Sequence, residues 1–154
     1  MLNTTNIEQL ENPIKIESKD GRVLEFTATA DFNFNSFIVK AFLTKNNEAY
    51  FIGSEITEVL DYKNPWDVFG KMREIDKLMV EYSHELYSIL HIGLNEVQND
   101  NSKIRHLMMI TETGLYDILA GATRKPKAKP FRYWLFDEVL PSIRKYGIYI
   151  LEER

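Results

Sequence analysis

The stretch RKPKAKPFRYWLFDEVLPSIRKYG, residues 124–147, carries the strongest charge signal of the chain and its clearest helical signal. No acid interrupts the cations at its start, which are Arg124, Lys125, Lys127, Lys129 and Arg132. Pro126 and Pro130 disfavour regular helix inside this run, so the sequence predicts an extended, exposed basic loop there.

A pair of helices is predicted after the loop. One apolar helical face repeats at Phe131, Trp134, Leu135 and Val139. Pro141 disfavours helical backbone at Leu140, where we expect a break or kink, and suits the first position of a new helix. Gly147 fits the left-handed position after that helix, with Arg144 and Lys145 in the last turn, where the helix dipole favours cations.

Composition indicates one compact domain with its own core, since the 154 residues are 44% hydrophobic and 12% aromatic. The chain has no cysteine, which excludes disulfides, thiolate metal sites and cysteine nucleophiles. It also lacks an apolar run of membrane-spanning length and a signal peptide pattern at its start. We therefore expect a soluble, cytoplasmic protein that makes no membrane contact.

Charge is distributed unevenly along the chain. The net charge is −4, but residues 1–100 alone carry a net charge of −8 and residues 101–154 a net charge of +4. This division permits a basic patch on an acidic body.

The first half predicts two β-hairpins and then two short helices. Residues 1–12 indicate a frayed or weakly helical lead, and Asp20-Gly21 is a strong hairpin signal. The predicted hairpins are 13–17 with 22–27 and 36–43 with 49–52.

The first helix is predicted to start at Ser54 as N-cap, and the second at Pro65 with Asn64 as N-cap. Trp66, Phe69 and Met72 form the expected inward face of the second helix. Residues 54–74 have the spacing of a helix-turn-helix, but acids outnumber cations there. We therefore favour two core-packing helices over a helix that faces phosphates.

The second half predicts a further strand pair and one more helix before the basic loop. Residues 77–104 are the least decided, with strands around a polar loop at 95–103. A strand at 105–110 and a helix with Thr111 or Thr113 as N-cap follow. The predicted fold class is α+β, with N-terminal β-hairpins, short helices, a further strand pair and a C-terminal helix pair in a single compact domain.

Catalysis finds no support in the sequence. His84, His91 and His106 form no metal-binding pair of the HExxH kind, and no phosphate-binding or nucleophile motif is present. We expect no catalytic residue, no metal, no cofactor and no enzymatic activity.

The basic loop is the better candidate for function, as a set of cations that contact phosphates. Tyr133, on the polar side of the helix, would add stacking or a hydrogen bond, and Arg144 with Lys145 would assist. The alternative is a solvated loop that keeps the protein soluble. The predicted DNA-binding residues are Arg124, Lys125, Lys127, Lys129, Arg132, Tyr133, Arg144 and Lys145.

Three segments carry a resemblance to a known family. They are FIGSEITEVLDYKNP (51–65), ITETGLYDIL (110–119) and RKPKAKPFRYWL…EVLPSIRKYGIY (124–149). In this order they resemble the N-terminal domain of the BRO family, found in phage antirepressors and baculovirus repeat proteins. The resemblance implies an α+β domain with DNA-binding activity, used in phage or prophage regulation in the host cytoplasm. It places a Bro-N-like domain at residues 34–150 and an added hairpin at 1–33.

The chain departs from the family pattern at three positions. Asp61 stands where the family often has Gly, Lys127 where an acid is usual, and Pro130 where a residue normally continues the helix. The change at Lys127 makes the loop more basic.

Two hypotheses on the partner follow. In the first, the chain is a phage-type regulator that binds double-stranded DNA through the basic loop. In the second, it is an antirepressor or host-takeover protein whose acidic body or aromatic helix face binds a repressor or another host protein. A homodimer paired through an edge strand at 148–151 is a further expectation.

Overall fold

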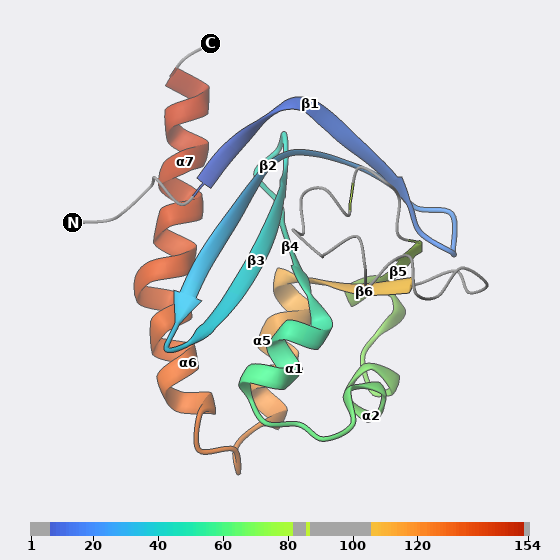
Figure 1. Cartoon of the computed structure of the whole chain (residues 1–154), viewed down its shortest axis with the longest axis vertical. Coiled ribbons are helices and arrows are strands. Elements are labelled where there is room, and N and C mark those ends of the chain that lie inside the picture. The colour runs from blue at the N-terminus through green and yellow to red at the C-terminus, as the bar shows by residue number, and fades with distance from the viewer. Residues whose placement is uncertain (1–6, 82–85, 87–105, 153–154) are drawn as a thin grey trace.

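A single six-stranded antiparallel sheet forms the body of the protein (Figure 1). The computed structural model describes residues 7–81, 86 and 106–152. The strand order is β1-β2-β3-β4-β6-β5. The strands are β1 (Ile7–Glu17), β2 (Val23–Phe34), β3 (Phe37–Thr44), β4 (Ala49–Ile52), β5 (Lys77–Glu81) and β6 (His106–Thr111). With the helices described below, the α+β prediction for one compact domain is confirmed.

The sheet curls until its two ends meet. An isolated bridge joins Ser18, just after β1, to Val80 of β5, and the Lys19 amide donates to the Met79 carbonyl over 2.9 Å. The predicted hairpin turn at Asp20-Gly21 is confirmed, because Gly21 has a φ of 91° that suits glycine. The curl brings the first hairpin against the strand pair β5–β6, which is far away in the sequence.

The N-terminal hairpin is longer than predicted. The expected frayed or weakly helical lead is wrong from Ile7 onward, because β1 pairs with β2 from that residue. The pairing is irregular between Gln9 and Ile14, around Pro13, which is where an edge strand tolerates a residue without an amide proton. The predicted extension 1–33 therefore adds strands to the same sheet, and its boundary at residue 33 stays a prediction.

Both faces of the sheet are buried, which explains the continuous apolar runs in β3, β4 and β6. Adjacent residues of a strand point to opposite faces, so Phe51 packs toward the helices whereas Ile52 packs inside the curl. Ile110 and Met109 divide in the same way. The interior of the curl includes Phe26, Phe42, Leu78 and Val80.

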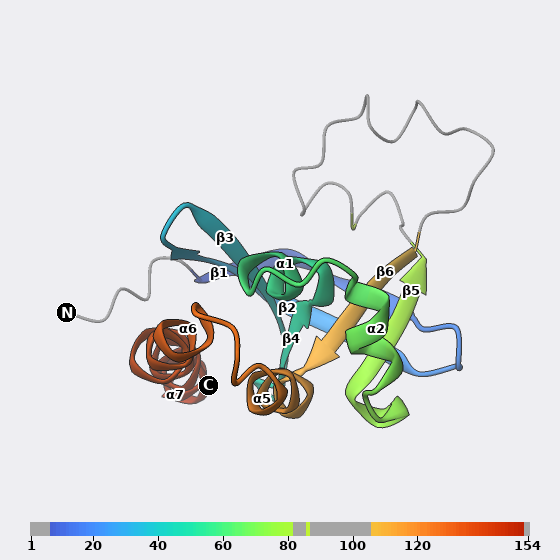
Figure 2. The ribbon, with the colours of Figure 1, turned by 90° about the horizontal axis from the view of Figure 1, so that it is seen from below.

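Helices cover the outer face of the sheet (Figure 2). Thr111 caps α5 as predicted, since its hydroxyl accepts the Gly114 amide over 3.0 Å. Figure 2 shows α5 between α2 on one side and α6–α7 on the other. The helices are α1 (Gly53–Val59), α2 (Pro65–Gly70), α5 (Glu112–Gly121), α6 (Ala128–Trp134) and α7 (Leu140–Glu152), with short turns η2 (Glu74–Asp76) and η3 (Leu135–Val139).

The two short helices differ from their prediction in detail. Ser54 is not the N-cap of α1, which starts at Gly53 without a side-chain cap. Glycine is required there because a Cβ would lie 2.7 Å from the Phe69 ring. The Asn64 cap of α2 is confirmed, but the expected inward position of Trp66 is wrong, since its side chain is 59% exposed. Trp66 lies in the first turn of α2 and packs edge to face on the buried Phe69 ring from the solvent side, with ring centres 5.6 Å apart.

The C-terminal helix pair is continuous rather than broken. Between α6 and α7, η3 is one π-helical turn, and of the break or kink predicted at Leu140 the break does not occur. A π-helical turn is wider than an α-helical one, and it changes the backbone hydrogen bonds where the Pro141 ring would otherwise clash with the carbonyl four residues before it. The helix therefore continues through the proline. Gly147 lies inside α7 instead of after its end, and the edge strand expected at 148–151 is helical as well.

A charged cluster links α1 to the sheet. Lys40 on β3 is 6% exposed and pairs with Asp31 on β2. The Glu55 carboxylate on α1 accepts the Lys40 backbone amide over 2.9 Å. Burial raises the pKa of Glu55 to about 7, while the hydrogen bond and charge of Lys40 oppose this and the charges of Asp31 and Glu58 add to it.

We expect Gly147→Ala to destabilise the protein by about 1–2 kcal/mol, although alanine favours helices. The new Cβ would lie 2.5 Å from Asn47 Nδ2, which donates to the Ile143 carbonyl over 2.8 Å. Urea denaturation measures the loss. The double variant Asn47→Gly/Gly147→Ala should recover stability, because Asn47 has a φ of 62° that glycine adopts freely. A stabilising Gly147→Ala would contradict the close approach.

We expect Glu55→Gln to be more stable than the wild type above pH 7, by about 2 kcal/mol, and equal to it near pH 4. The folded pKa of Glu55 is raised, so its contribution to stability is fully present below the unfolded pKa and is lost as the pH rises through about 7. Denaturation midpoints across this range test it. Glu25→Gln, at an exposed position on β2 outside this cluster, is the control and should leave the pH profile unchanged. Parallel profiles of Glu55→Gln and wild type would refute the expectation.

Candidate nucleic-acid interface

The basic loop is compact, not extended as predicted. Residues 122–127 connect α5 to α6 in two consecutive turns, closed by the Lys125 amide on the Ala122 carbonyl (3.0 Å) and the Ala128 amide on the Lys125 carbonyl (3.1 Å). Ala122 and Ala128 are buried and fix the two ends of the loop in the core. Pro130 lies in the first turn of α6, where helical amides have no intrahelical acceptor, so it does not interrupt the helix.

Two cations of the loop contact the turn that follows α1. Lys125 Nζ donates to the Asp61 carbonyl over 2.9 Å and lies 4.6 Å from the centre of the Tyr62 ring. Lys127 Nζ lies 3.4 Å from an Asp61 carboxylate oxygen and 5.1 Å from the centre of the Phe37 ring. These contacts hold the loop on the turn at Asp61 and Tyr62.

The other three cations of the run 124–132 pair with no carboxylate in the described part of the chain. Arg124, Lys129 and Arg132 are exposed and make no ion pair there. Lys129 and Arg132 flank the half-exposed Tyr133 ring, at 5.9 and 5.7 Å from its centre. This outer side of α6 therefore presents a phenol between two cations.

Arg144 and Lys145 lie apart from the rest of the predicted set. They follow Arg132 by about three turns of helix, roughly 18 Å along the axis. Arg144 is also engaged, since its guanidinium lies 3.5 Å from the Glu112 carboxylate on α5. The structure thus brings together Arg124, Lys125, Lys127, Lys129, Arg132 and Tyr133, and leaves Arg144 and Lys145 as outlying cations.

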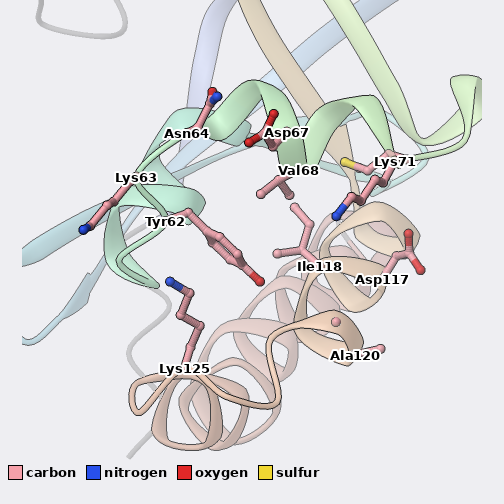
Figure 3. A pocket seen from close by; sticks show the side chains of 12 residues that line it. Tyr62, Lys63, Asn64, Asp67, Val68, Lys71, Asp117, Ile118, Ala120 and Lys125 are labelled. Carbon is pink, nitrogen blue, oxygen red and sulfur yellow. The ribbon is translucent and has the colours of Figure 1, made fainter.

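A pocket of about 800 Å³ opens beside the loop, between α2 and α5 (Figure 3). Lys125 points toward Tyr62 at one side, and Lys71 extends over the floor near Ile118. Asp67 and Asp117 also line the pocket, so its wall is mixed in charge. Burial raises the pKa of the Tyr62 hydroxyl, which keeps this phenol neutral at physiological pH.

The sequence analysis missed Lys63 and Lys71, which border the same pocket. Lys63 stands within the segment 51–65, next to Tyr62 and Asn64, so the motif itself was the available signal. Seven cations lie on the loop after α1, directly after α2, on the loop before α6 and on α6 itself, and three of them, Lys63, Lys71 and Lys125, border the pocket. We call this the basic surface: Lys63, Lys71, Arg124, Lys125, Lys127, Lys129 and Arg132.

Among the described residues, no group of three or more His, Asp or Glu side chains is placed to hold a metal ion. No helix in the described ranges has both the length and the apolar character needed to cross a bilayer. Of the histidines, His106 lies on β6 near Glu81, at 4.0 Å, whereas His84 and His91 fall outside the described residues.

The three segments that carry the family resemblance meet at the pocket. Tyr62, Lys63 and Asn64 come from the first segment, Asp117 and Ile118 from the second, and Lys125 from the third. A family model described as the BRO family, N-terminal domain, matches residues 39–141, which is more than half of the chain. The pocket and the whole basic surface lie within the match.

Relatives with similar sequences occur in a bacterium and in an invertebrate virus. An uncharacterized protein of Haemophilus influenzae is 29% identical over 121 residues, which cover 79% of this chain and 52% of the relative. Two Bro-N domain-containing proteins of Invertebrate iridescent virus 6 are 27% and 30% identical and cover 70% and 68% of the chain. The chain spans about half of the bacterial relative and 26% of each viral one. No solved structure matches the chain.

Proposed function

The chain belongs to the BRO family, whose N-terminal domain it matches over residues 39–141. We propose that it is a phage-type, antirepressor-like regulator that binds double-stranded DNA through the basic surface. It acts in the cytoplasm of the host cell by binding alone, without catalysis or a cofactor. The observation that supports this most is the packing of the cationic loop before α6 on the turn after α1, which joins cations of two family segments beside one pocket.

Arg124, Lys129 and Arg132 are the principal phosphate contacts. Their charges are exposed and unneutralised by the described carboxylates, and two of them are guanidinium groups that bind phosphate oxygens bidentately. Lys63 and Lys71 extend the surface across the pocket, and the Tyr133 hydroxyl supplies a further hydrogen bond. Such contacts position a protein on the duplex and give affinity that does not depend on sequence.

Arg124→Ala/Lys129→Ala/Arg132→Ala should weaken binding to a random-sequence duplex and flatten its salt dependence. The slope of log K against log salt concentration is negative, and each lost phosphate contact reduces its magnitude by about 0.9. The triple change should therefore reduce the magnitude of the slope by roughly 2 to 3. Fluorescence anisotropy across a salt series measures both quantities.

The matched control is Lys15→Ala/Lys19→Ala/Lys45→Ala, which removes the same charge from exposed positions outside the basic surface. It should retain most of the affinity and nearly the whole slope. Equal losses in the two triple variants would mean that only net charge matters. Absence of wild-type binding at low salt would refute the DNA proposal.

A repressor or another host protein is the second candidate partner, supported by a different surface. Trp66 and Ile75 are 59% and 68% exposed. Trp66 and Phe69 border a groove of about 380 Å³ that also contains Met79 and Met108. Exposed tryptophan beside a flexible methionine floor is typical of protein-binding sites.

Trp66→Ala should abolish recovery of a repressor in a pull-down from lysate of the lysogenic host, if this candidate is correct. Phe136→Ala, which truncates another half-exposed aromatic side chain on η3, is the control and should leave recovery unchanged. Mass spectrometry identifies the recovered protein. Equal recovery by all three proteins, or no repressor with any of them, would argue against this candidate.

A further inference from the structure

Asp61 occupies a position that favours glycine. It follows α1 with a φ of 64°, and its amide donates to the Glu58 carbonyl (3.1 Å) while the Tyr62 amide donates to the Thr57 carbonyl (2.9 Å). These two bonds form a Schellman motif, whose left-handed residue is usually glycine and sometimes asparagine. An aspartate here adopts an unfavourable backbone conformation, so a side-chain role for the carboxylate is worth seeking.

The carboxylate contacts the basic loop. It lies 3.4 Å from Lys127 Nζ, and the carbonyl of the same residue accepts Lys125 Nζ over 2.9 Å. Asp61 therefore presents an anionic oxygen and a carbonyl oxygen to two neighbouring ammonium groups. A phosphate of a DNA backbone would offer oxygens of the same kind to the same two lysines.

The contact is open to exchange. The Asp61 and Lys127 side chains are 57% and 37% exposed, and pairs of this kind contribute little stability in water. A phosphate that displaces the carboxylate lies within reach of both lysines, because both approach the same residue. Only a modest free energy opposes the displacement.

We propose that the Asp61 carboxylate is an internal competitor for phosphate, which occupies Lys127 in the free protein and lowers the affinity of the basic loop for DNA. This inference rests on the proposed function, because it assigns an autoinhibitory contact to the same surface. Lys127 engages DNA only after the carboxylate moves away, whereas Arg124, Lys129 and Arg132 engage without such a step. Asp61 thereby limits binding at Lys127 to ligands whose phosphate displaces its carboxylate.

Asp61→Asn removes the charge and keeps a residue that tolerates the left-handed conformation. We expect it to bind a random-sequence duplex about two- to fivefold more tightly than wild type, as an exposed ion pair predicts. The slope of log K against log salt concentration should steepen by up to about 0.9, since Lys127 would then neutralise one further phosphate and release its condensed counterion. In a Lys127→Ala background, the gain from Asp61→Asn should disappear. Thermal denaturation checks that every variant is folded.

Weaker binding by Asp61→Asn would identify Asp61 as a residue that positions the lysines, and unchanged binding would deny it any role. Either result overturns the proposal. If no variant binds duplex at low salt, the proposed function fails, and titration with inorganic tripolyphosphate then decides the inference. NMR signals of the Lys125 and Lys127 side chains should shift at lower tripolyphosphate concentration in Asp61→Asn than in wild type. Equal titrations would overturn it.

Discussion

The packing of α6 on the β2–β3 hairpin is the interaction on which the rest of the structure depends. Phe131 is fully buried and meets Phe34 edge to face, with ring centres 5.3 Å apart. Trp134 packs on Phe34 at 5.1 Å and on Phe32 at 6.5 Å. Aromatic contacts of this kind combine large apolar burial with a preferred geometry. They fix the start of α6, and with it one end of the basic loop, so that mutually repelling cations are held close together in two consecutive turns.

The sequence predicted what depends on neighbouring residues. The turn at Gly21, the Asn64 cap, the Thr111 cap and the apolar face from Phe131 to Val139 all follow from local patterns. The continuity of the last helix did not follow, because Pro141 favours a break locally and only a π-helical turn reconciles it with packing on both sides. Tyr146 continues the buried side beyond the proline. A break would have separated the two parts of that side.

What the sequence missed arises from contacts between distant segments. Nothing around Trp66 indicates that it packs on Phe69 from the solvent side instead of entering the core, and the segment around Lys63 does not identify the loop at Lys125 as its neighbour at the pocket. The departures from the family pattern at Asp61 and Lys127 looked independent in the sequence. In the structure they contact each other, since the acid appears in the turn and the cation in the loop. A glycine at the first position and an acid at the second would place no such pair there.

The pairing of an acid at position 61 with a cation at position 127 explains how a cationic loop persists on a protein whose net charge is −4. Lys125 and Lys127 each have a partner oxygen on Asp61. The repulsion between like charges therefore acts mainly among the exposed cations around them. The acidic remainder of the chain repels polyanions whereas the basic surface attracts them, so under the proposed function the field of the protein orients DNA toward α6 and the pocket. Under the two proposals, Asp61 lowers the charge of the loop and weakens its contact with DNA without removing this orientation. The whole charge distribution would then govern the approach of DNA, and the local ion pair would govern how long it stays bound.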